Sequence, residues 1–289
     1  MGRAPDFVVR WREARDANAW AQFVASGKDG IVWPVGAGAK LRLTKDLFLA
    51  EGIVKGQFEI GERRFLTKVL RKGDCFVDVG ANIGLFTVLA GKLVGPSGKV
   101  IALEPAPATR QVLEKQVLLN RLRNVEIVPL GLSDRRCVEQ LWCSQDGNDA
   151  FNSFGKPLQG ELYQPVDVPT TTLDDLCQEL LGGFAPRLIK IDVEGWEPKV
   201  LAGGGEILRS SRAPDLLVEF CEAALRNASS SCEQLFGALE SLGYRMFEVN
   251  GYHGLLTPLD QIKPIAYCNV LATKGQPPFS LMMRSLPPP

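Results

Sequence analysis

The sequence predicts an α/β fold of the doubly wound kind, in which a mostly parallel sheet carries helices on both faces. Two observations lead to this prediction. From Asp74 onwards, short apolar segments alternate with segments of helical pattern, and such alternation produces parallel strands covered on both sides. The first apolar segment, 75–79, runs into a turn bracketed by Gly80 and Gly84 that opens into a helix. This Rossmann-like unit is typical of the ligand-binding edge of such sheets.

The first 72 residues are expected to form an N-terminal extension or lid. A helical pattern surrounds Phe7 to Ala14, and apolar runs at 31–35 and 41–43 flank a Gly36-Ala37-Gly38 turn, which predicts a β-hairpin. A second helix is expected at 58–70, because Lys72-Gly73 is a good stop signal. We expect the aromatic residues of this region to form a small satellite core rather than a substrate platform: Trp11, Trp20, Phe23 and Trp33.

The main domain is expected at 73–275. Its predicted elements are strands at 75–79, 100–103, 125–130, 188–191, 216–220, 244–249 and 269–272, with helices at 85–93, 108–119 and near 233–242. Residues 135–172 are rich in turn residues and contain one apparent strand near 138–142, so we interpret them as an insertion near the site. Residues 276–289 end in three prolines and are expected to be a disordered tail.

Composition limits the classes of partner. The chain has 289 residues, of which 45% are hydrophobic and 23% charged, enough to bury a full core. Lys plus Arg equal Asp plus Glu at 33 each, so no general field attracts nucleic acid or an acidic membrane. The longest apolar run, 83–94, is interrupted by Lys92 and is too short to span a bilayer. We therefore expect a soluble protein with no membrane partner.

The cysteines and the N-terminus bear on localisation. The seven cysteines form no C-x-x-C pair, and His253 is the single histidine, so reduced and buried thiols are the expected state. The N-terminus lacks the apolar region of a signal peptide, and Asp6 stands where a myristoylation signal needs Ser or Thr. These features indicate a cytoplasmic protein.

The turn after the first strand indicates a cofactor site. Gly80 and Gly84 permit a sharp turn and a close backbone approach, and the first N–H groups of the helix can bind a carboxylate or phosphate. Asn82 stands at the middle glycine of the G-x-G-x-x-G dinucleotide fingerprint, so a cofactor without a pyrophosphate fits better. S-adenosylmethionine is such a cofactor, with a carboxylate for the helix N-terminus and an ammonium for Asp78. The alternative is that Asp78 only caps the helix and the glycines only turn the chain.

Glu104 ends the second predicted strand, where an acid can accept hydrogen bonds from both ribose hydroxyls of a nucleoside. The same acid would suit NAD, so it predicts a nucleoside without identifying it. A solvated acid before the next helix is the alternative.

Asp192 and Glu194 follow the strand at 188–191 and should lie at the same sheet edge as Asp78 and Glu104. Such crowded acids suggest a catalytic base, a clamp for a substrate hydroxyl, or a divalent cation site that could include Glu219. No spacing is diagnostic of a metal, so no metal ligand is assigned. The alternative is that Glu194 and Glu197 only favour the next helix N-terminus.

His253 lies in the 250–254 loop, which could close over a substrate and supply a base. A solvated loop histidine is the favoured alternative.

The segments named so far resemble the FkbM-type methyltransferases of the class I S-adenosylmethionine-dependent group over about 59–273. The most specific matches are 77–84, Glu104-Pro105, 131–134 and 189–197. The resemblance implies a seven-stranded sheet whose antiparallel last strand is at 269–272. It also implies methyl transfer to a hydroxyl of a sugar, polyketide or other secondary metabolite.

The resemblance also implies residue roles. The methionine part would be held by Asp78, Gly80, Asn82 and Gly84, the ribose by Glu104, and the adenine edge by the 132–134 turn with Leu132 and Ser133. The candidate catalytic residues are Asp192, Glu194 and His253. Substrate choice is expected to depend on the insertion and on the N-terminal extension.

Three hypotheses for function remain open at this stage: an O-methyltransferase, an NAD-dependent oxidoreductase on a similar sheet, and a non-catalytic cofactor-binding module. The Asn-Pro-Pro-Tyr or Asp-Pro-Pro-Tyr turn of base-methylating enzymes is replaced here by Asp192-Val193-Glu194-Gly195. With the balanced charge, this argues against nucleic acid and for a small-molecule or glycan hydroxyl acceptor. The sequence identifies neither the acceptor nor the oligomeric state.

Overall fold

The computed structural model describes residues 18–144, 152–155, 162–181, 186–261, 267–277 and 279–282. The helix expected around Phe7 to Ala14 lies outside these residues, as do 278 and 283–289 of the expected tail and part of the expected insertion. The expected disorder is not seen at Leu281, which is buried in the core. A helical stretch at 18–25 precedes the first strand. Among the described residues, no helix combines the length and the apolar character needed to cross a bilayer.

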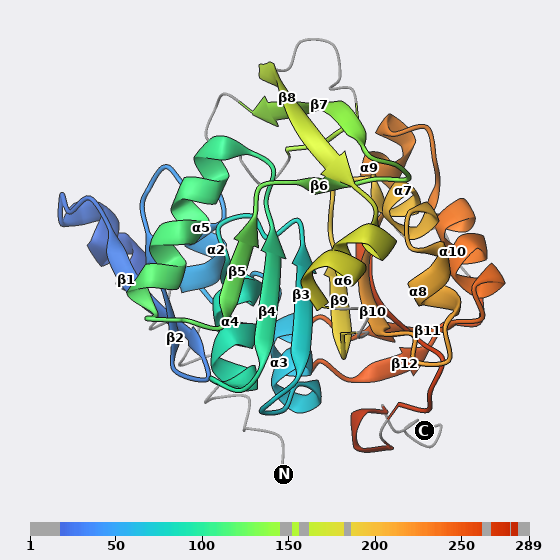
Figure 1. Ribbon diagram of the computed structural model, residues 1–289. Coiled ribbons are helices and arrows are strands. Elements are labelled where there is room, and N and C mark those ends of the chain that lie inside the picture. Colours follow the sequence, from blue (N-terminus) through green and yellow to red (C-terminus); the bar gives the residue numbers. More distant parts are fainter. Residues whose placement is uncertain are drawn as a thin grey trace.

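An eight-stranded sheet forms the centre of the molecule, in the order β12-β11-β13-β10-β9-β3-β4-β5 (Figure 1). Its strands are β3 (Cys75–Val79), β4 (Lys99–Leu103), β5 (Val125–Val128), β9 (Leu188–Ile191), β10 (Asp215–Cys221), β11 (Arg245–Val249), β12 (Leu256–Pro258) and β13 (Tyr267–Thr273). The five strands from β10 to β5 are parallel, and β13 is antiparallel to both β10 and β11. The doubly wound sheet with its antiparallel last strand is confirmed, and β12 extends the expected seven strands by one.

Helices and further chain segments cover both faces of this sheet. The helices are α2 (Ala50–Val54), α3 (Ile60–Val69), α4 (Leu85–Val94), α5 (Pro107–Leu119), α6 (Leu173–Leu181), α7 (Glu197–Ala202), α8 (Gly205–Arg209), α9 (Glu222–Asn227) and α10 (Cys232–Ser241), with a 3-10 turn at Phe279–Leu281. Side chains alternate between the two faces along each strand. Phe76 of β3 therefore joins the core under α3 and α4, whereas Val77 joins the core under α6 to α10.

The N-terminal region forms the expected hairpin, with β1 (Ile31–Gly36) and β2 (Ala39–Leu43) joined at the Gly36 to Gly38 turn, and α3 is the expected second helix. The expectation of a separate satellite core was wrong. Leu41 and Leu43 of β2 belong to the same apolar cluster as Phe76, and Trp20 and Trp33 pack against it. The reason is that β2 lies on α4 and α5, so its buried face continues the main core.

Two side-chain amides, one within α5 and one directly after it, attach this hairpin to the main domain. Gln116 accepts a hydrogen bond from the Arg42 N–H and donates one to the Arg42 carbonyl, and Asn120 does the same for Lys40. Side-chain amides thus replace a neighbouring strand along β2 and satisfy its edge. The hairpin is therefore fixed in register against the helix.

Part of the expected insertion forms a second sheet rather than irregular loops. Its strands are β6 (Gly131–Leu132), β7 (Cys137–Ser144) and β8 (Tyr163–Thr171), in the order β6-β8-β7. Proline has no N–H group to donate to a neighbouring strand, so Pro165 and Pro169 argue against a strand when the sequence is considered alone. For this reason β8 was not predicted. Both face β7, and β6 pairs with β8 only at Thr170 and Thr171. This small sheet lies beyond the carboxyl ends of the parallel strands (Figure 1).

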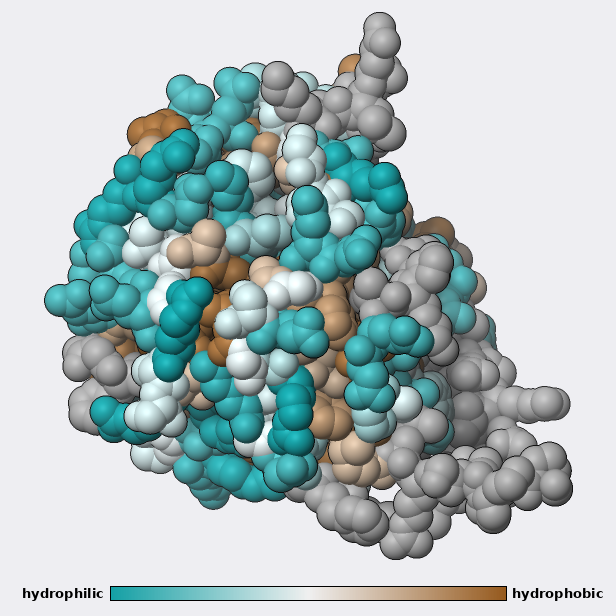
Figure 2. Space-filling view, turned by 90° about the vertical axis from the view of Figure 1, so that its right-hand side faces the viewer, coloured by the Kyte–Doolittle hydropathy of each residue, from teal (hydrophilic) through white to brown (hydrophobic). Residues whose placement is uncertain are grey.

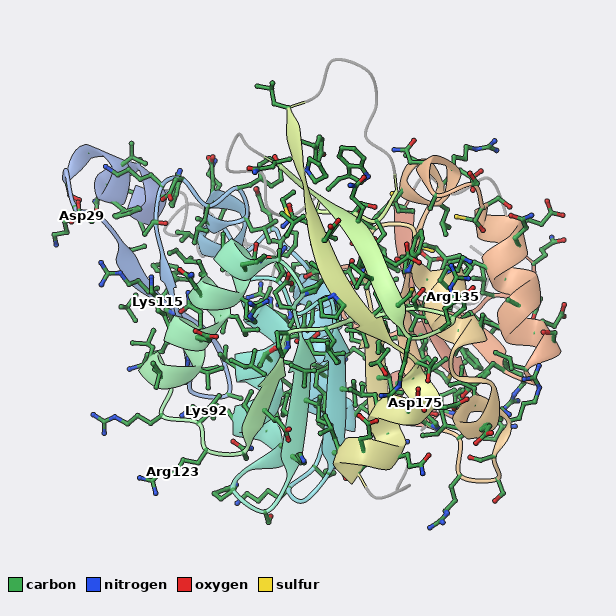
Figure 3. All side chains as sticks on the ribbon, turned by 45° about the horizontal axis from the view of Figure 1, so that its top comes forward. Asp29, Lys92, Lys115, Arg123, Arg135 and Asp175 are labelled. Atoms are coloured by element: carbon green, nitrogen blue, oxygen red, sulfur yellow. The ribbon has the colours of Figure 1, made fainter. Side chains whose placement is uncertain are left out.

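The surface over α7 to α10 is mostly hydrophilic, with small apolar areas between polar side chains (Figure 2). Charged side chains of both signs, among them Asp29, Lys115 and Arg123, point away from the core (Figure 3). The seven cysteines are all free thiols, three buried and four half-buried.

Candidate functional site

Polar side chains gather on one face of the sheet, at the carboxyl ends of its parallel strands. They are Asp78 of β3, Glu104 after β4, Lys190 of β9, Asp192 after β9 and Glu219 of β10. The apolar residues that alternate with them, Val77, Ile191 and Val218, belong to the core on the opposite face. The period of two along each strand therefore places all five on the side covered by α3 and α4.

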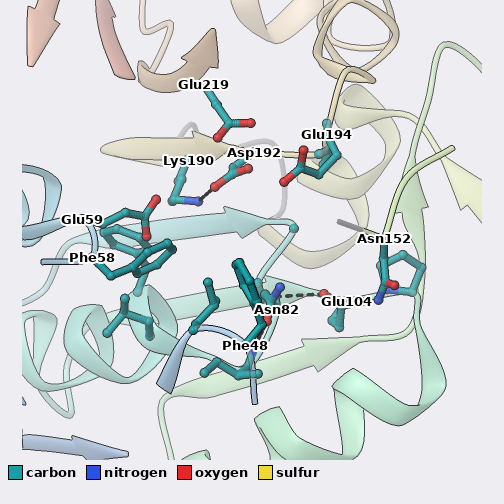
Figure 4. Close-up of a pocket in the computed structure, with 18 of the residues that line it drawn as sticks. Phe48, Phe58, Glu59, Asn82, Glu104, Asn152, Lys190, Asp192, Glu194 and Glu219 are labelled. Carbon is teal, nitrogen blue, oxygen red and sulfur yellow. Dashed lines mark hydrogen bonds and ion pairs between the residues drawn. The ribbon is translucent and has the colours of Figure 1, made fainter. Parts of the chain in front are cut away.

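These strand ends border a cavity of about 270 Å³, here called the central cavity (Figure 4). Residues 80–83 and Glu104 line one side, and Lys190, Asp192, Glu194 and Glu219 line the other. The N-terminal region adds Phe48, Phe58 and Glu59 to the wall, and the insertion adds Leu141, Asn152 and Phe154. Three parts of the chain that are far apart in sequence thus meet at one site.

The turn after β3 requires glycine at two positions. Gly80 has φ +80°, and a Cβ there would lie 1.9 Å from the carbonyl oxygen of Asp192. Gly84 has φ +94° and begins α4, and its Cβ would lie 2.6 Å from Cδ1 of Leu113. Asn82 also takes a left-handed conformation, which asparagine tolerates better than most residues. Glycine at these two positions therefore lets the turn after β3 pack closely against the turn after β9 and against α5.

Glu104 is fixed at the wall of the central cavity by two backbone donors. Its Oε2 accepts a hydrogen bond from the Asn82 N–H at 2.8 Å, and its Oε1 accepts one from the Ala106 N–H at 2.9 Å. The carboxylate is thus held in a fixed orientation beside the glycine turn.

Asp78 lies behind the cavity wall rather than in it. Its carboxylate is buried, and Oδ2 accepts a hydrogen bond from the Thr87 hydroxyl at 2.6 Å. Burial raises the pKa of Asp78 to about 6, although Lys190, its register partner on β9, opposes this. Asp78 therefore faces Lys190 and α4, and a contact with a cofactor ammonium stays a prediction.

Among the described residues that line the central cavity, Lys190 alone has a basic side chain. Its Nζ lies 2.5 Å from Oδ2 of Asp192 and 4.7 Å from the ring centre of Phe86. Burial alone would lower the pKa of Lys190, but Asp192, Glu59 and Asp78 outweigh it and raise the pKa above its ordinary value. The ammonium thus stays charged and anchors Asp192.

The turn after β9 is held in an unusual conformation by a buried acid. Glu194 and Gly195 have φ +52° and +97°. Oε1 of Glu197 accepts hydrogen bonds from the N–H groups of Val193 and Gly195, and the Ser153 hydroxyl donates to the Glu194 carbonyl at 2.6 Å. Glu197 therefore shapes the turn from behind, which presents the Glu194 side chain to the central cavity.

Three other acids of the wall have strongly perturbed titration. Burial raises the pKa of Glu59 to about 8, and burial with Asp192 and Glu197 raises that of Glu194 to about 9. Burial, Asp192 and Glu194 also raise the pKa of Glu219. Perturbed acids grouped in a cavity are typical of functional sites.

The comparisons with known proteins identify the family. The family model described as the methyltransferase FkbM domain matches residues 78–246, more than half of the chain. The protein belongs to the FkbM methyltransferase family. The family resemblance of the sequence is thereby confirmed.

Three curated proteins resemble this FkbM family protein. Methyltransferase sdnD of Sordaria araneosa is 33% identical, over 45% of this chain and 60% of sdnD. The 2-O-methyltransferase NoeI of Sinorhizobium fredii is 32% identical, over 56% of this chain and 71% of NoeI. The 31-O-demethyl-FK506 methyltransferase FkbM of Streptomyces tacrolimicus is 27% identical, over 56% of this chain and 76% of that protein. The chain therefore spans less than two thirds of sdnD.

In this FkbM family member, the structure brings Gly80, Asn82, Glu104, Asp192 and Glu194 together at the central cavity. Gly84 lies at the start of α4, behind the wall. The structure does not bring the other four predicted site residues to the wall: Asp78, Leu132, Ser133 and His253.

Leu132 and Ser133 are buried in and next to β6, so their contact with an adenine edge stays a prediction. His253 is exposed on a loop that is tied to α3, because Arg64 and Lys68 donate to the carbonyls of Tyr252 and His253. This position differs from a loop that closes over the substrate, and it gives no support to His253 as a base.

Several wall residues of this FkbM family member were not predicted as site residues. Lys190 could have been predicted from the sequence, because a lysine in the middle of a buried apolar strand is rare unless it is paired. Glu219 was considered only as a metal ligand, although an acid in the buried strand β10 is unusual in the same way. No sequence pattern indicates Glu59, Asn152 and Phe154, since they reach the cavity only through tertiary packing.

Proposed function

We propose that this protein transfers a methyl group from S-adenosylmethionine to a hydroxyl group of a small molecule or glycan. The observation that carries the proposal is the position of Glu104, fixed by two backbone donors beside a glycine turn and across the central cavity from Asp192. Family membership supports methyl transfer. The relatives named as a 2-O-methyltransferase and a 31-O-demethyl-FK506 methyltransferase support oxygen as the acceptor atom.

The residues present fit S-adenosylmethionine. Gly80 and Ala81 line the central cavity, so backbone groups of this turn can lie against a bound ligand. Glu104 is a carboxylate at the cavity wall, and a carboxylate can accept hydrogen bonds from ribose hydroxyls. Asn82 occupies the position of the middle glycine of the dinucleotide fingerprint, which argues against a pyrophosphate at this turn. When bound, S-adenosylmethionine supplies an electrophilic methyl group on a sulfonium.

Alignment of the acceptor oxygen with the methyl carbon and sulfur matters most in such an in-line displacement. Positioning can supply roughly 7–11 kcal/mol of the barrier, whereas a general base contributes roughly 10²–10⁴-fold. Asp192, held by the Lys190 ammonium, is the better candidate to accept the hydroxyl proton. Glu194 has a pKa of about 9, so it carries its own proton at neutral pH in the ligand-free protein.

The acceptor is expected to enter between two parts of the chain outside the strand ends. Phe48 and Phe58 line one side of the central cavity, and Leu141 and Phe154 line another. Phe154 also packs on Trp196, with ring centres 5.3 Å apart. Apolar and aromatic walls of this kind suit the ring faces of sugars and of secondary metabolites. The N-terminal region and the insertion would thus set acceptor choice.

Calorimetric titration with S-adenosylhomocysteine and with NAD tests the cofactor. Binding of S-adenosylhomocysteine without NAD is the expected result, and the reverse would support the oxidoreductase hypothesis. An assay of methyl transfer from labelled S-adenosylmethionine to a panel of sugars and hydroxylated metabolites tests the chemistry. Asp192→Asn should bind S-adenosylhomocysteine normally and turn over slowly. A protein that binds the cofactor but methylates no acceptor would instead fit a non-catalytic module.

A further inference from the structure

Three carboxylates converge where β9 and β10 end, outside the part of the cavity assigned to the cofactor. Asp192, Glu194 and Glu219 each offer a ligand oxygen, and these oxygens all lie within 4.8 Å of one another. Figure 4 shows the Glu219 and Asp192 side chains directed toward the same part of the cavity. Carboxylate oxygens are the ligands that hard divalent cations prefer, at about 2.0–2.6 Å. Three oxygens with this spacing can surround one such ion.

A second observation points to a missing positive partner. Glu219 is 6% exposed, and its Oε2 is buried without a hydrogen-bond donor among the described residues. An acceptor left in this state costs about 1–3 kcal/mol, and more when it is charged. Natural proteins rarely keep such a group without a role. Glu219 itself lines the central cavity.

The ion pairs of the site also leave carboxylates without a positive partner. Lys190 pairs with Asp192 through Oδ2, so Asp192 retains a second oxygen for another partner. Among the described residues, no basic side chain forms an ion pair with Glu194 or Glu219. Repulsion opposes the ionisation of all three carboxylates in one cavity unless a cation lies between them. A doubly charged ion among the three carboxylates would remove this repulsion.

We propose that Asp192, Glu194 and Glu219 bind one hard divalent cation of the Mg²⁺, Mn²⁺ or Ca²⁺ class. The protein supplies three ligands, so coordination positions remain for water or for oxygen atoms of the acceptor. An acceptor with neighbouring hydroxyl groups would chelate the ion and would be oriented by it. This orienting role rests on the proposed methyl transfer, whereas the binding of the ion does not.

Binding is tested with Mn²⁺ as the probe, followed by electron paramagnetic resonance on the full-length protein saturated with S-adenosylhomocysteine. We expect one Mn²⁺ site per chain that Mg²⁺ or Ca²⁺ displaces. Glu219→Gln and Glu194→Gln keep the side-chain size and remove the charge. Each should weaken Mn²⁺ binding by at least about 10-fold. Loss of a residue that only hydrogen-bonds to a metal ligand already weakens metal binding by about 10-fold to 100-fold, and loss of a ligand should cost at least as much. Glu233→Gln, an exposed position on α10, should bind Mn²⁺ like the unmodified protein.

Equal Mn²⁺ affinity in the unmodified protein and both cavity variants would overturn the proposal, as would no Mn²⁺ binding by the unmodified protein. Calorimetry with S-adenosylhomocysteine shows whether each variant is folded. If Glu219→Gln is not folded, the Mn²⁺ affinity of Glu194→Gln tests the proposal. Cofactor binding without Mn²⁺ binding refutes the cation site and leaves the proposed function standing. Mn²⁺ binding without cofactor binding or methyl transfer refutes the proposed function alone.

Discussion

A Cβ atom on Gly80 would lie 1.9 Å from the carbonyl oxygen of Asp192. The turn after β3 and the turn after β9 are therefore packed backbone against backbone, and only glycine fits between them. This contact fixes the distance between the proposed cofactor turn and the acid that we propose as the proton acceptor.

The first prediction follows from this contact. Gly80→Ala should lower the free energy of unfolding well beyond the cost of its positive φ, and should abolish binding of S-adenosylhomocysteine. Gly38→Ala is the matched control, because Gly38 has φ +78° and no atom within 4 Å of its Cβ position. The control should lose about 1–2 kcal/mol from strain alone. Urea unfolding and calorimetry measure both effects, and equal losses in the two variants would contradict the packing argument.

The second prediction concerns Glu104. Glu104→Gln keeps one carbonyl acceptor but removes the charge that would bind ribose hydroxyls. Hydrogen bonds to a charged group contribute about 1.5–3 kcal/mol, so affinity for S-adenosylhomocysteine should fall by roughly 10-fold to 100-fold. Glu126→Gln on the neighbouring β5, where the side chain is exposed, should leave affinity unchanged. Calorimetry provides the measurement, and an unchanged affinity in Glu104→Gln would remove the ribose role.

The sequence predicted the sheet well because its parallel strands are buried on both faces and therefore appear as uninterrupted apolar segments. The strand at 188–191 matches β9 at both ends. Residues at strand ends were also predictable, since parallel strands bring their carboxyl ends to one edge. Gly80, Glu104 and Asp192 reached the cavity for this reason.

Residues contributed by loops and by distant segments could not be predicted in this way. Glu59 joins the wall because α3 packs beside β11, and Asn152 joins it because the Ser144 N–H donates to its side chain. Neither contact leaves a local pattern. His253 shows the opposite case, since a residue of the right chemistry lies near the right edge while its loop is tied to α3.

The third prediction tests the Lys190 and Asp192 ion pair with a double-mutant cycle. Removing one partner of a buried pair costs about 3–5 kcal/mol, because the other charge is left uncompensated. Lys190→Met and Asp192→Asn should each destabilise the protein, and the double variant should recover about 1–3 kcal/mol relative to the sum. The exposed pair Arg187 and Asp215, at 2.6 Å, is the control cycle and should couple by less than about 1 kcal/mol. Additive effects of Lys190→Met and Asp192→Asn on urea unfolding would show that the buried pair is not coupled.

The fourth prediction concerns the pH dependence of stability through Glu197. Burial raises its pKa from 4.5 to about 7, against the hydrogen bonds from Val193 and Gly195 that lower it. A group with a raised pKa in the folded state contributes stability that is complete below pH 4.5 and is lost as pH rises through about 7, because the unfolded chain ionises first. Glu197→Gln stays neutral, keeps an oxygen for both N–H groups, and lacks this loss.

The unfolding free energy of the unmodified protein should therefore fall relative to Glu197→Gln between pH 4.5 and 7, by on the order of 3 kcal/mol. Acids that do not interact with Glu197 are common to both proteins and cancel in the difference, whereas Glu194 and Glu219 interact with Glu197 and do not cancel completely. Urea unfolding at half-unit steps of pH provides the two curves, with Glu233→Gln as the reference for losing a carboxylate at the surface. If the curves of the unmodified protein and Glu197→Gln run parallel, Glu197 is ionised in both the folded and the unfolded chain, and its buried charge must then be balanced by another group near the turn.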